Sequence, residues 1–214
     1  MEFQHYIVYV SPNGLVALAA MQRPYIDLVT PWMNDPEATA GIVLNPPLTL
    51  ESEIEWYEKI GKGSDIIFAI LSRKEVSEKF QYVGHTGLHR VTWPDARATS
   101  GTFIGDPEAR GRGVGKEAKM LLLHHAFRVV GLRKVTSEVK AFNLASVGHL
   151  VACGYSIVGC RKEQHFSNGA FVDEILLEVH RRDFEPLWDI YQETKKAPKL
   201  TEKQKAEIKR LFPE

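Results

Sequence analysis

Apolar positions divide the first sixty residues into a β-rich start followed by two helices. A short apolar run over residues 15–21 follows the turn signal Ser-Pro-Asn-Gly and predicts a strand, and residues 3–10 form an earlier candidate strand. Apolar side chains then recur at helical spacing over residues 24–32 and 49–60. The opening element is therefore β, and two helices follow it.

The rest of the chain combines a β-meander with β-α-β order. Three β-like runs are followed by a long helix, a strand, a shorter helix and a final hairpin, at residues 65–71, 80–91, 98–105, 114–130, 134–139, 143–153, 155–166 and 170–180. The hairpin closes at Ser167-Asn168-Gly169, and Asn-Gly is typical of a tight turn. This order predicts an α+β fold, with a mixed, mainly antiparallel central sheet flanked by helices.

Length and tail set the expected domain organisation. With 214 residues, of which 44% are hydrophobic, the chain can bury one core and carry a short appendage. After Pro198 a capping-box pattern, Thr201-x-x-Gln204, starts a helix with one apolar stripe. We therefore expect one domain over residues 1–185 and a C-terminal helical extension over residues 186–214. The extension either docks on its own domain or contributes to a homodimer.

Charge and cysteine content disfavour several kinds of partner. Lys plus Arg and Asp plus Glu both number 27, so a net charge of zero supplies no field for attracting nucleic acid or an anionic membrane. Cys153 and Cys160 lack CxxC spacing and nearby histidine pairs, which indicates reduced thiols rather than a disulfide or a metal site. No apolar run approaches the roughly 20 residues that span a bilayer, and the start lacks a signal-peptide pattern. We expect a cytoplasmic protein without a bound metal.

A glycine-rich loop before the longest helix is the candidate ligand site. Residues 110–116 read Arg-Gly-Arg-Gly-Val-Gly-Lys. Glycines allow a ligand to approach the backbone closely, consecutive N–H groups can converge on phosphate oxygens, and the N-terminus of the following helix favours an anion. Arg110, Arg112 and Lys116 add positive charge. The loop therefore indicates a phosphate-bearing ligand.

Two other nucleotide motifs compete for these residues. A P-loop fails because Lys116 is followed by Glu117 rather than by Ser or Thr. A dinucleotide fingerprint matches better, since Gly113-x-Gly115-x-x-Ala has its variant form and Glu138 lies about 20 residues further on. However, an antiparallel hairpin precedes the loop where the first strand of a βαβ unit is required. A dinucleotide oxidoreductase is therefore a discounted alternative.

The pattern Arg110-x-x-Gly113-x-Gly115 resembles the acetyl-CoA signature of the GNAT family of N-acetyltransferases. Asn143-x-x-Ser146, with a Gly-Tyr pair at the end of its helix, resembles the second motif of that family. The resemblance implies the acyl-CoA N-acyltransferase fold, with acetyl-CoA as co-substrate and no metal. It also implies a set of cofactor-binding residues: Phe103, Ile104, Arg110, Gly111, Arg112, Gly113, Val114, Gly115, Lys116, Asn143 and Ser146.

Further segments narrow the resemblance to one branch of the family. Residues 32–37, 83–88, 104–107 and 171–173 resemble ribosomal-protein N-terminal acetyltransferases, the RimJ/RimL-like branch. The chain departs from that branch over residues 18–24, where Leu-Ala-Ala-Met-Gln-Arg-Pro stands in place of a Leu-Arg-Pro-like strand ending.

The resemblance implies direct attack of a neutral amine on the acetyl thioester, without an acyl-enzyme. Backbone N–H groups of residues 102–104 are the implied donors to the oxyanion. A base must first take a proton from the ammonium, and three residues of the final hairpin are candidates: Glu163, His165 and Asp173. Many family members protonate the leaving thiolate with a tyrosine, but Leu150 stands at that position. Ser146 is the closest substitute.

These observations predict an N-acetyltransferase that moves the acetyl group of acetyl-CoA to a primary amine, such as the α-amine of a protein N-terminus. A small amine, such as a polyamine, an aminoglycoside or an amino sugar, fits the CoA motif equally well. A non-catalytic acyl-CoA-binding module is a third alternative, because the tyrosine is missing and the base is not fixed by any motif.

Overall fold

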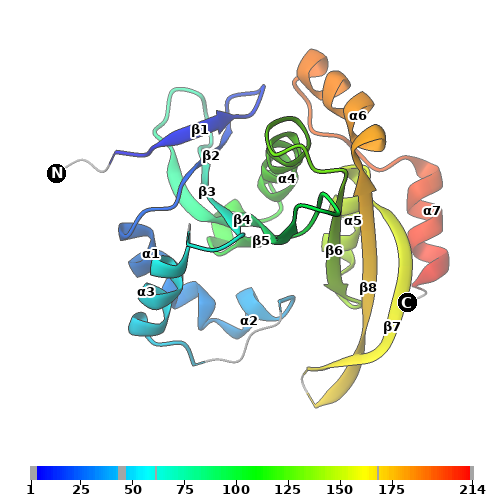
Figure 1. Cartoon of the computed structure of the whole chain (residues 1–214), viewed down its shortest axis with the longest axis horizontal. Helices are drawn as coiled ribbons and strands as arrows, with labels where there is room; N and C mark the ends of the chain where they lie inside the picture. Colours follow the sequence, from blue (N-terminus) through cyan, green and yellow to red (C-terminus); the bar gives the residue numbers. More distant parts are fainter. Residues whose placement is uncertain (1–3, 43–46, 61, 168, 213–214) are drawn as a thin grey trace.

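The computed structural model describes residues 4–42, 47–60, 62–167 and 169–212, and these build an eight-stranded sheet with helices on both faces (Figure 1). The strand order is β1-β2-β3-β4-β5-β6-β8-β7, and neighbours are antiparallel except β5 and β6. The predicted α+β class and mainly antiparallel sheet are confirmed. Phe3 of the first predicted strand and Asn168 of the predicted turn lie outside the described residues.

The strands follow the predicted runs closely. Their bounds are β1 (Ile7–Val10), β2 (Val16–Ala20), β3 (Ile66–Ser72), β4 (Gln81–Thr92), β5 (Arg97–Ile104), β6 (Lys134–Lys140), β7 (Ser156–Ser167) and β8 (Ala170–His180). The first strand begins at Ile7, later than the predicted start. Strands β3, β4 and β5 form the predicted meander, β1 and β2 extend it on one side, and the final hairpin places β7 at the edge of the sheet.

Side-chain alternation in β2 shows how the two faces of the sheet are covered. Val16 and Leu18 belong to the main core, which contains the buried face of α4 (Val114–His124). Ala17 belongs to a smaller cluster with α1 (Pro24–Met33). The remaining helices are α2 (Pro36–Thr39), α3 (Leu50–Lys59), the 3-10 turn η1 (Pro107–Ala109), the π-helical turn η2 (His125–Val129), α5 (Leu144–Ala152), α6 (Arg181–Thr194) and α7 (Glu202–Leu211). Within the described residues, none of these helices is long and apolar enough to cross a bilayer.

The long helix predicted over residues 114–130 differs from the structure in its last turn. Regular α-helix ends at His124, and η2 continues the helix with a wider turn. Gly131 follows with a φ of 79°, as expected for a glycine that ends a helix. The existence of the helix is confirmed, and its final turn is π rather than α.

The C-terminal segment packs on the rest of the chain. The predicted boundary at residue 185 falls inside α6, whose Phe184, Trp188 and Tyr191 are buried in the main core. The predicted capping box of α7 is present, and the helix lies beside α5, where Gln204 Nε2 donates to the carbonyl oxygen of Val151 at 3.4 Å. The division into two domains stays a prediction.

Candidate active site

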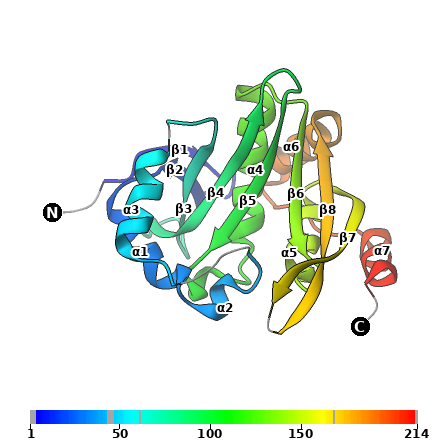
Figure 2. The same cartoon turned by 60° about the horizontal axis from the view of Figure 1, so that its bottom comes forward.

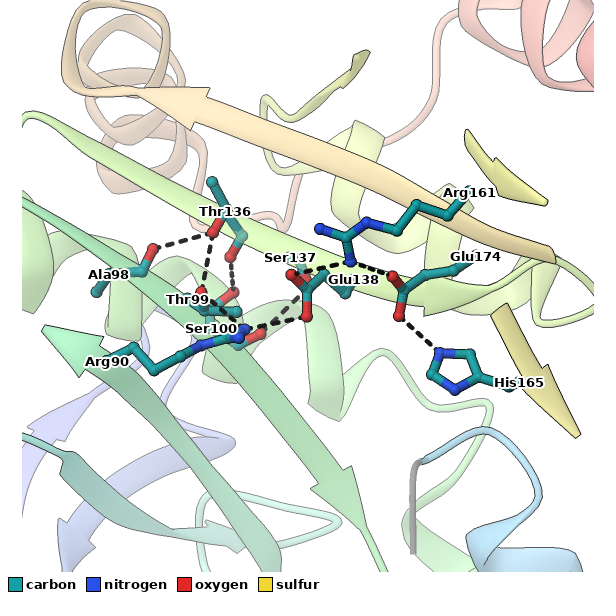
Figure 3. Close-up of polar contacts among 10 residues, drawn as sticks. All are labelled: Arg90, Ala98, Thr99, Ser100, Thr136, Ser137, Glu138, Arg161, His165 and Glu174. Carbon is teal, nitrogen blue, oxygen red and sulfur yellow. Dashed lines mark hydrogen bonds and ion pairs between the residues drawn. The ribbon is translucent and has the colours of Figure 1, made fainter. Parts of the chain in front are cut away.

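Strands β5 and β6 separate after a short parallel stretch (Figure 2). Pairing joins residues 97–99 to residues 134–136 and ends there. Beyond it, the Ser100 hydroxyl donates to the carbonyl oxygen of Thr136 at 3.3 Å, and the Ser137 hydroxyl donates to that of Ser100 at 3.2 Å (Figure 3). A cavity of about 780 Å³ is lined by the separated halves of both strands and by the first turns of α4 and α5.

The predicted glycine loop borders this cavity. Gly111 and Gly113 have φ angles of 71° and 84°, in the left-handed region that glycine adopts without strain. A Cβ atom at either position would meet nothing within 4 Å, so the space beside the loop is open. Because α4 begins at Val114, the free N–H groups of its first turn and the positive end of its dipole lie at this opening.

The three basic side chains of the loop have different surroundings. Lys116 lines the cavity. Arg110 also lines it, but its guanidinium donates to the carbonyl oxygens of Ile104 and the following residue at 3.0 and 2.8 Å, which fastens the loop to the end of β5. Arg112 donates to the carbonyl oxygen of Arg73 at 3.3 Å and does not line the cavity. The geometry therefore presents Lys116 to a ligand more directly than either arginine.

Asn143 and Ser146 lie together at the start of α5 and line the cavity, as do Phe103 and Ile104 of β5. Asn143 Oδ1 accepts from the backbone N–H of Ser146 at 3.1 Å, so Asn143 is the N-cap of the helix. Its amide packs tightly against Gly41, where a Cβ atom would lie 2.3 Å from Nδ2. This contact brings the segment after α2 to the edge of the cavity.

A chain of charged side chains forms another wall (Figure 3). Glu174 is only 4% exposed, and its two carboxylate oxygens contact His165 Nε2 at 2.7 Å and Arg161 Nη1 at 2.5 Å. The same Nη1 lies 3.6 Å from Glu138, whose other oxygen accepts from Arg90 Nη2 at 3.0 Å. His165, Glu138 and Glu174 line the cavity. An imidazole with a buried carboxylate partner therefore stands at the site.

A bulge in β7 explains how two side chains reach one carboxylate. Arg161 pairs with Glu174, and His165 pairs with Val172, so the residues between Arg161 and His165 leave the ladder. Glu163 lies in this bulge with a φ of 52°. Because residues on one face repeat every second position, His165 is a diagonal neighbour of Glu174.

The other two predicted base candidates lie away from the cavity lining. Glu163 is exposed. The Asp173 carboxylate accepts from Lys162 Nζ at 2.7 Å and from the Glu163 backbone N–H at 2.9 Å, and these bonds lower the pKa of Asp173. Of the three candidates, the structure brings only His165 to the cavity, together with Ser146 on α5.

Sequence reasoning missed Glu174, Lys119 and His149, which all line the cavity. The hairpin register contains the signal for Glu174, because pairing of Ser167 with Ala170 places it diagonal to His165. Lys119 lies four residues after a loop glycine, on the same helix face. His149 gives no such signal. No group of three or more His, Cys, Asp or Glu side chains that could hold a metal ion occurs in the described part of the chain.

Residues 18–156 match the family described as acetyltransferase (GNAT) domain. The chain belongs to the GNAT acetyltransferase family. The predicted family is confirmed, and the GNAT domain uses acetyl-CoA as its co-substrate. The matched region holds β5, β6, the glycine loop, α4 and α5, whereas most of the β7–β8 hairpin lies beyond it.

Two curated relatives are also N-acetyltransferases by name. Alpha/beta-tubulin-N-acetyltransferase 9 of Drosophila melanogaster is 30% identical over 133 residues, which cover 58% of this chain and 66% of that protein. The N-acetyltransferase 9-like protein of Caenorhabditis briggsae is 25% identical over 122 residues, which cover 54% and 61%. The chain thus spans slightly less than two thirds of either relative.

A solved structure shares the GNAT fold. Spermidine N-acetyltransferase from Vibrio cholerae, in complex with CoA and spermine, superposes with a TM-score of 0.73 at 19% identity. The match covers 80% of this chain and 99% of that chain. These similarities support the GNAT family as a whole, and they do not single out the ribosomal-protein branch.

Proposed function

We propose that this chain transfers the acetyl group of acetyl-CoA to the α-amine at the N-terminus of a protein or peptide, as the ribosomal-protein branch of the family does. The CoA pyrophosphate lies against the N–H groups of residues 111–116 and against Lys116. The pantetheine arm extends between β5 and β6 toward Ser100. Support comes from the open space at the loop glycines and from the separation of the two strands.

The contact between His165 and Glu174 on the cavity wall is the observation that carries the proposal. With Nε2–H donating to the carboxylate, Nδ1 keeps a lone pair that can take the proton of an ammonium. The neutral amine then attacks the carbonyl carbon of the thioester. Backbone N–H groups of residues 102–104 donate to the oxyanion. Glu174 orients the imidazole and stabilises its positive charge after the proton transfer.

The charges on the cavity wall favour a monoamine over a polyamine. Glu37, Glu138 and Glu174 are the carboxylates that line the described cavity. Two of them already contact arginine, because Arg161 reaches both Glu138 and Glu174 and a second guanidinium reaches Glu138 as well. A polycation needs carboxylates that are free to pair with each of its ammonium groups. The Drosophila melanogaster relative, a tubulin N-acetyltransferase by name, also points to a protein acceptor.

The base assignment is tested by a matched pair of variants. His165→Gln should lower kcat/KM about 100-fold, a typical contribution of general base catalysis. His180→Gln is the control, because His180 also contacts a glutamate on β8, Glu178, but does not line the cavity. We expect the control to stay within twofold of the wild type. Equal losses in both variants, or no loss in His165→Gln, would remove His165 from the reaction.

The acceptor is tested by CoA release, followed with a thiol reagent, on three substrates. These are peptides with free N-terminal amines, the same peptides with blocked N-termini and an internal lysine, and spermidine. We expect turnover only on the free α-amines. Turnover on spermidine alone would make the chain a polyamine acetyltransferase, the class to which its solved structural neighbour belongs by name.

A homodimer through the tail stays a prediction. Leu200, Ile208 and Phe212 pack against the core of their own chain, which favours docking of the tail in cis. Sedimentation of the full chain and of a chain lacking residues 198–214 separates the two arrangements. A lower oligomeric mass after the deletion would support the dimer, and an unchanged mass would count against it.

A further inference from the structure

Lys119 is a buried lysine in the cavity lining, beside Ser100. It lies on α4, one helical turn beyond Gly115, and is only 1% exposed. Its Nζ donates to Ser100 Oγ at 2.9 Å, at the residue where β5 leaves β6. Lys119 also lines the cavity, so the ammonium group stands between the core and the ligand space.

The buried ammonium lacks a negative partner. Within residues 4–42, 47–60, 62–167 and 169–212, no carboxylate lies within ion-pair distance of Lys119. Ser100 Oγ already donates to the Thr136 carbonyl, so it accepts from Lys119 and from the Tyr155 hydroxyl, which lies at 2.8 Å. Two N–H groups of the ammonium therefore remain for another acceptor. An uncompensated buried charge is unfavourable for folding, which indicates a role with an anionic ligand.

His149 supplies a second, independent observation at the same place. It lies on α5 and lines the cavity, and its Nε2 is a buried atom without a hydrogen-bond partner. Burial, together with the charges of Lys119 and Lys116, lowers the pKa of His149 to about 3, so its imidazole is neutral. Burial also lowers the pKa of Lys119 to about 8. Within the described residues, the Nε2 atom of His149 has no hydrogen-bond partner and the ammonium of Lys119 has only Ser100.

The distance from the glycine loop places this end of the cavity at the sulfur of CoA. Ile104 lies next to Gly115, where a Cβ atom would be 3.8 Å from Ile104 Cγ1. Ser100 precedes Ile104 by four residues of strand, about 13 Å at 3.3 Å per residue, which is comparable with the pantetheine arm between the pyrophosphate and the sulfur. Because the sulfur and the oxyanion share the thioester carbon, Thr102, two residues from Ser100, is the residue among 102–104 whose N–H donates to the oxyanion in this arrangement.

We infer that Lys119 is the catalytic acid that stabilises and protonates the leaving CoA thiolate. Lys119 thus has the role that a tyrosine has in many family members, where this chain has Leu150, and it replaces Ser146 as the candidate acid. This inference rests on the proposed function. When the tetrahedral adduct collapses, the C–S bond breaks and its electron pair goes to sulfur. Sulfur takes a proton from the Lys119 ammonium, and the neutral lysine recovers one from solvent after CoA leaves. The acceptor ammonium loses two protons in the whole reaction. One corresponds to the proton that the CoA thiol gains, and the other is released to solvent.

Other titratable groups near Lys119 affect its protonation. Its titratable neighbours come from α4, α5 and the start of the final hairpin: Lys116, Glu117, His149, Cys153 and Tyr155. Burial raises the pKa of Cys153 to about 12, so this thiol stays protonated. Glu117, whose pKa burial raises to about 7, does not line the cavity, so among these groups Lys119 is the buried cavity-lining one that can give up a proton near neutral pH.

The test uses CoA itself, so no acceptor amine is required. The ultraviolet absorbance of the thiolate is titrated for CoA bound to the wild type and to Lys119→Met. We expect the thiol of bound CoA to ionise at least one pH unit lower in the wild type than in the variant, because an adjacent opposite charge shifts a pKa by about 1–3 units. Desulfo-CoA, which lacks the sulfur, should bind both proteins equally.

Lys116→Met is the matched control, since Lys116 lines the same cavity one turn earlier on α4. It should weaken CoA and desulfo-CoA binding equally, by about tenfold, and leave the ionisation of the bound thiol unchanged. The opposite behaviour of the two lysines would locate the sulfur at Lys119. An equal ionisation pH in the wild type and in Lys119→Met would overturn the inference while leaving CoA binding intact. Absence of CoA binding to the wild type would instead overturn the proposed function.

Stability separates a chemical role from a structural one. Replacement of a lysine that stabilises the fold would lower Tm. Removal of an uncompensated buried charge instead leaves Tm unchanged or raises it. We expect Lys119→Met to keep or raise Tm and to lower kcat with the acceptor found by the peptide panel. A lower Tm without a change in bound-thiol ionisation would assign Lys119 to the core. If Lys119→Met fails to fold, Ser100→Ala is the second variant. It keeps the Lys119 ammonium, so the thiol of bound CoA should ionise at the wild-type pH, and ionisation at a higher pH would contradict the inference.

Discussion

The two ends of the cavity are built in different ways. The loop at residues 110–116 offers backbone N–H groups and glycine conformations from one short stretch of sequence. The wall at Glu174 consists of side chains that come from four strands, between Arg90 on β4 and Glu174 on β8. A backbone site depends on the conformational freedom of particular residues. A side-chain site depends on strand register, and it is sensitive to the loss of single functional groups.

The largest expected effect comes from a change in backbone freedom at the loop. Gly113→Glu forces a side chain onto a residue with φ of 84° and places a carboxylate where the proposed pyrophosphate lies. We expect acetyl-CoA affinity, measured by calorimetry, to fall more than 100-fold. The matched control is Gly131→Glu, because Gly131 has a φ of 79°, equally open space at Cβ and no place in the cavity lining.

The control separates backbone strain from loss of the ligand site. Both substitutions should lower Tm to a similar extent, since a non-glycine residue in the left-handed region costs about 1 kcal/mol. Only Gly113→Glu should lose acetyl-CoA. If both variants bind acetyl-CoA as the wild type does, the loop is not the phosphate site and the contrast between the two ends of the cavity is wrong.

A smaller effect is expected from one functional group in the wall. Glu174→Gln removes the carboxylate that orients His165 and leaves Arg161 with its longer contact to Glu138, at 3.6 Å. We expect kcat to fall about tenfold while acetyl-CoA affinity stays within twofold, because an orienting residue acts through the group it holds. This variant should therefore alter the rate where Gly113→Glu alters the binding.

Glu178 provides the control for the wall, because it lies on the same strand and also holds one histidine and one basic side chain. Its carboxylate contacts His180 Nε2 at 3.3 Å and Lys134 Nζ at 2.7 Å. It does not line the cavity. Glu178→Gln should leave kcat unchanged. A loss in Glu178→Gln as large as in Glu174→Gln would show that charged clusters of β8 stabilise the sheet and that neither has a special role in the reaction.

This contrast also explains which parts of the protein could be predicted. The glycine loop and the family were predicted because their residues are adjacent or at fixed helical spacing. The strands were predicted to within about one residue where apolar runs end at turn signals, as in β3, β4 and β5. The approach of Arg161 to the Glu174 carboxylate that His165 also contacts needs the bulge in β7, which no local pattern encodes. The approach of Lys119 to Ser100 needs the tertiary packing of α4 on β5.

The smallest expected effect concerns Glu117, which adds a non-local support to the loop end of the cavity. Glu117 lies in the first turn of α4, directly after the loop, and is 6% exposed. Its carboxylate accepts from Asn13 Nδ2 at 2.9 Å and from the hydroxyl of Tyr191 on α6. The start of α4 is thus held by segments from both ends of the chain. If this support affects stability without affecting acetyl-CoA affinity, the loop end binds its ligand through local residues alone, in contrast to the wall.

Burial raises the pKa of Glu117 from 4.5 to about 7, against the hydrogen bond from Asn13 and the charge of Lys116. Between these two pH values the folded chain holds a proton that the unfolded chain has released, so Glu117 makes stability fall as pH rises from about 4.5 to 7. Glu117→Gln cannot ionise and loses one acceptor at every pH. We expect its Tm relative to the wild type to rise by a few degrees from pH 5 to pH 8, with the exposed Glu207→Gln as control. A pH-independent difference would mean that Glu117 is ionised throughout this range, and a parallel change in acetyl-CoA affinity would mean that the loop depends on distant segments as much as the wall does.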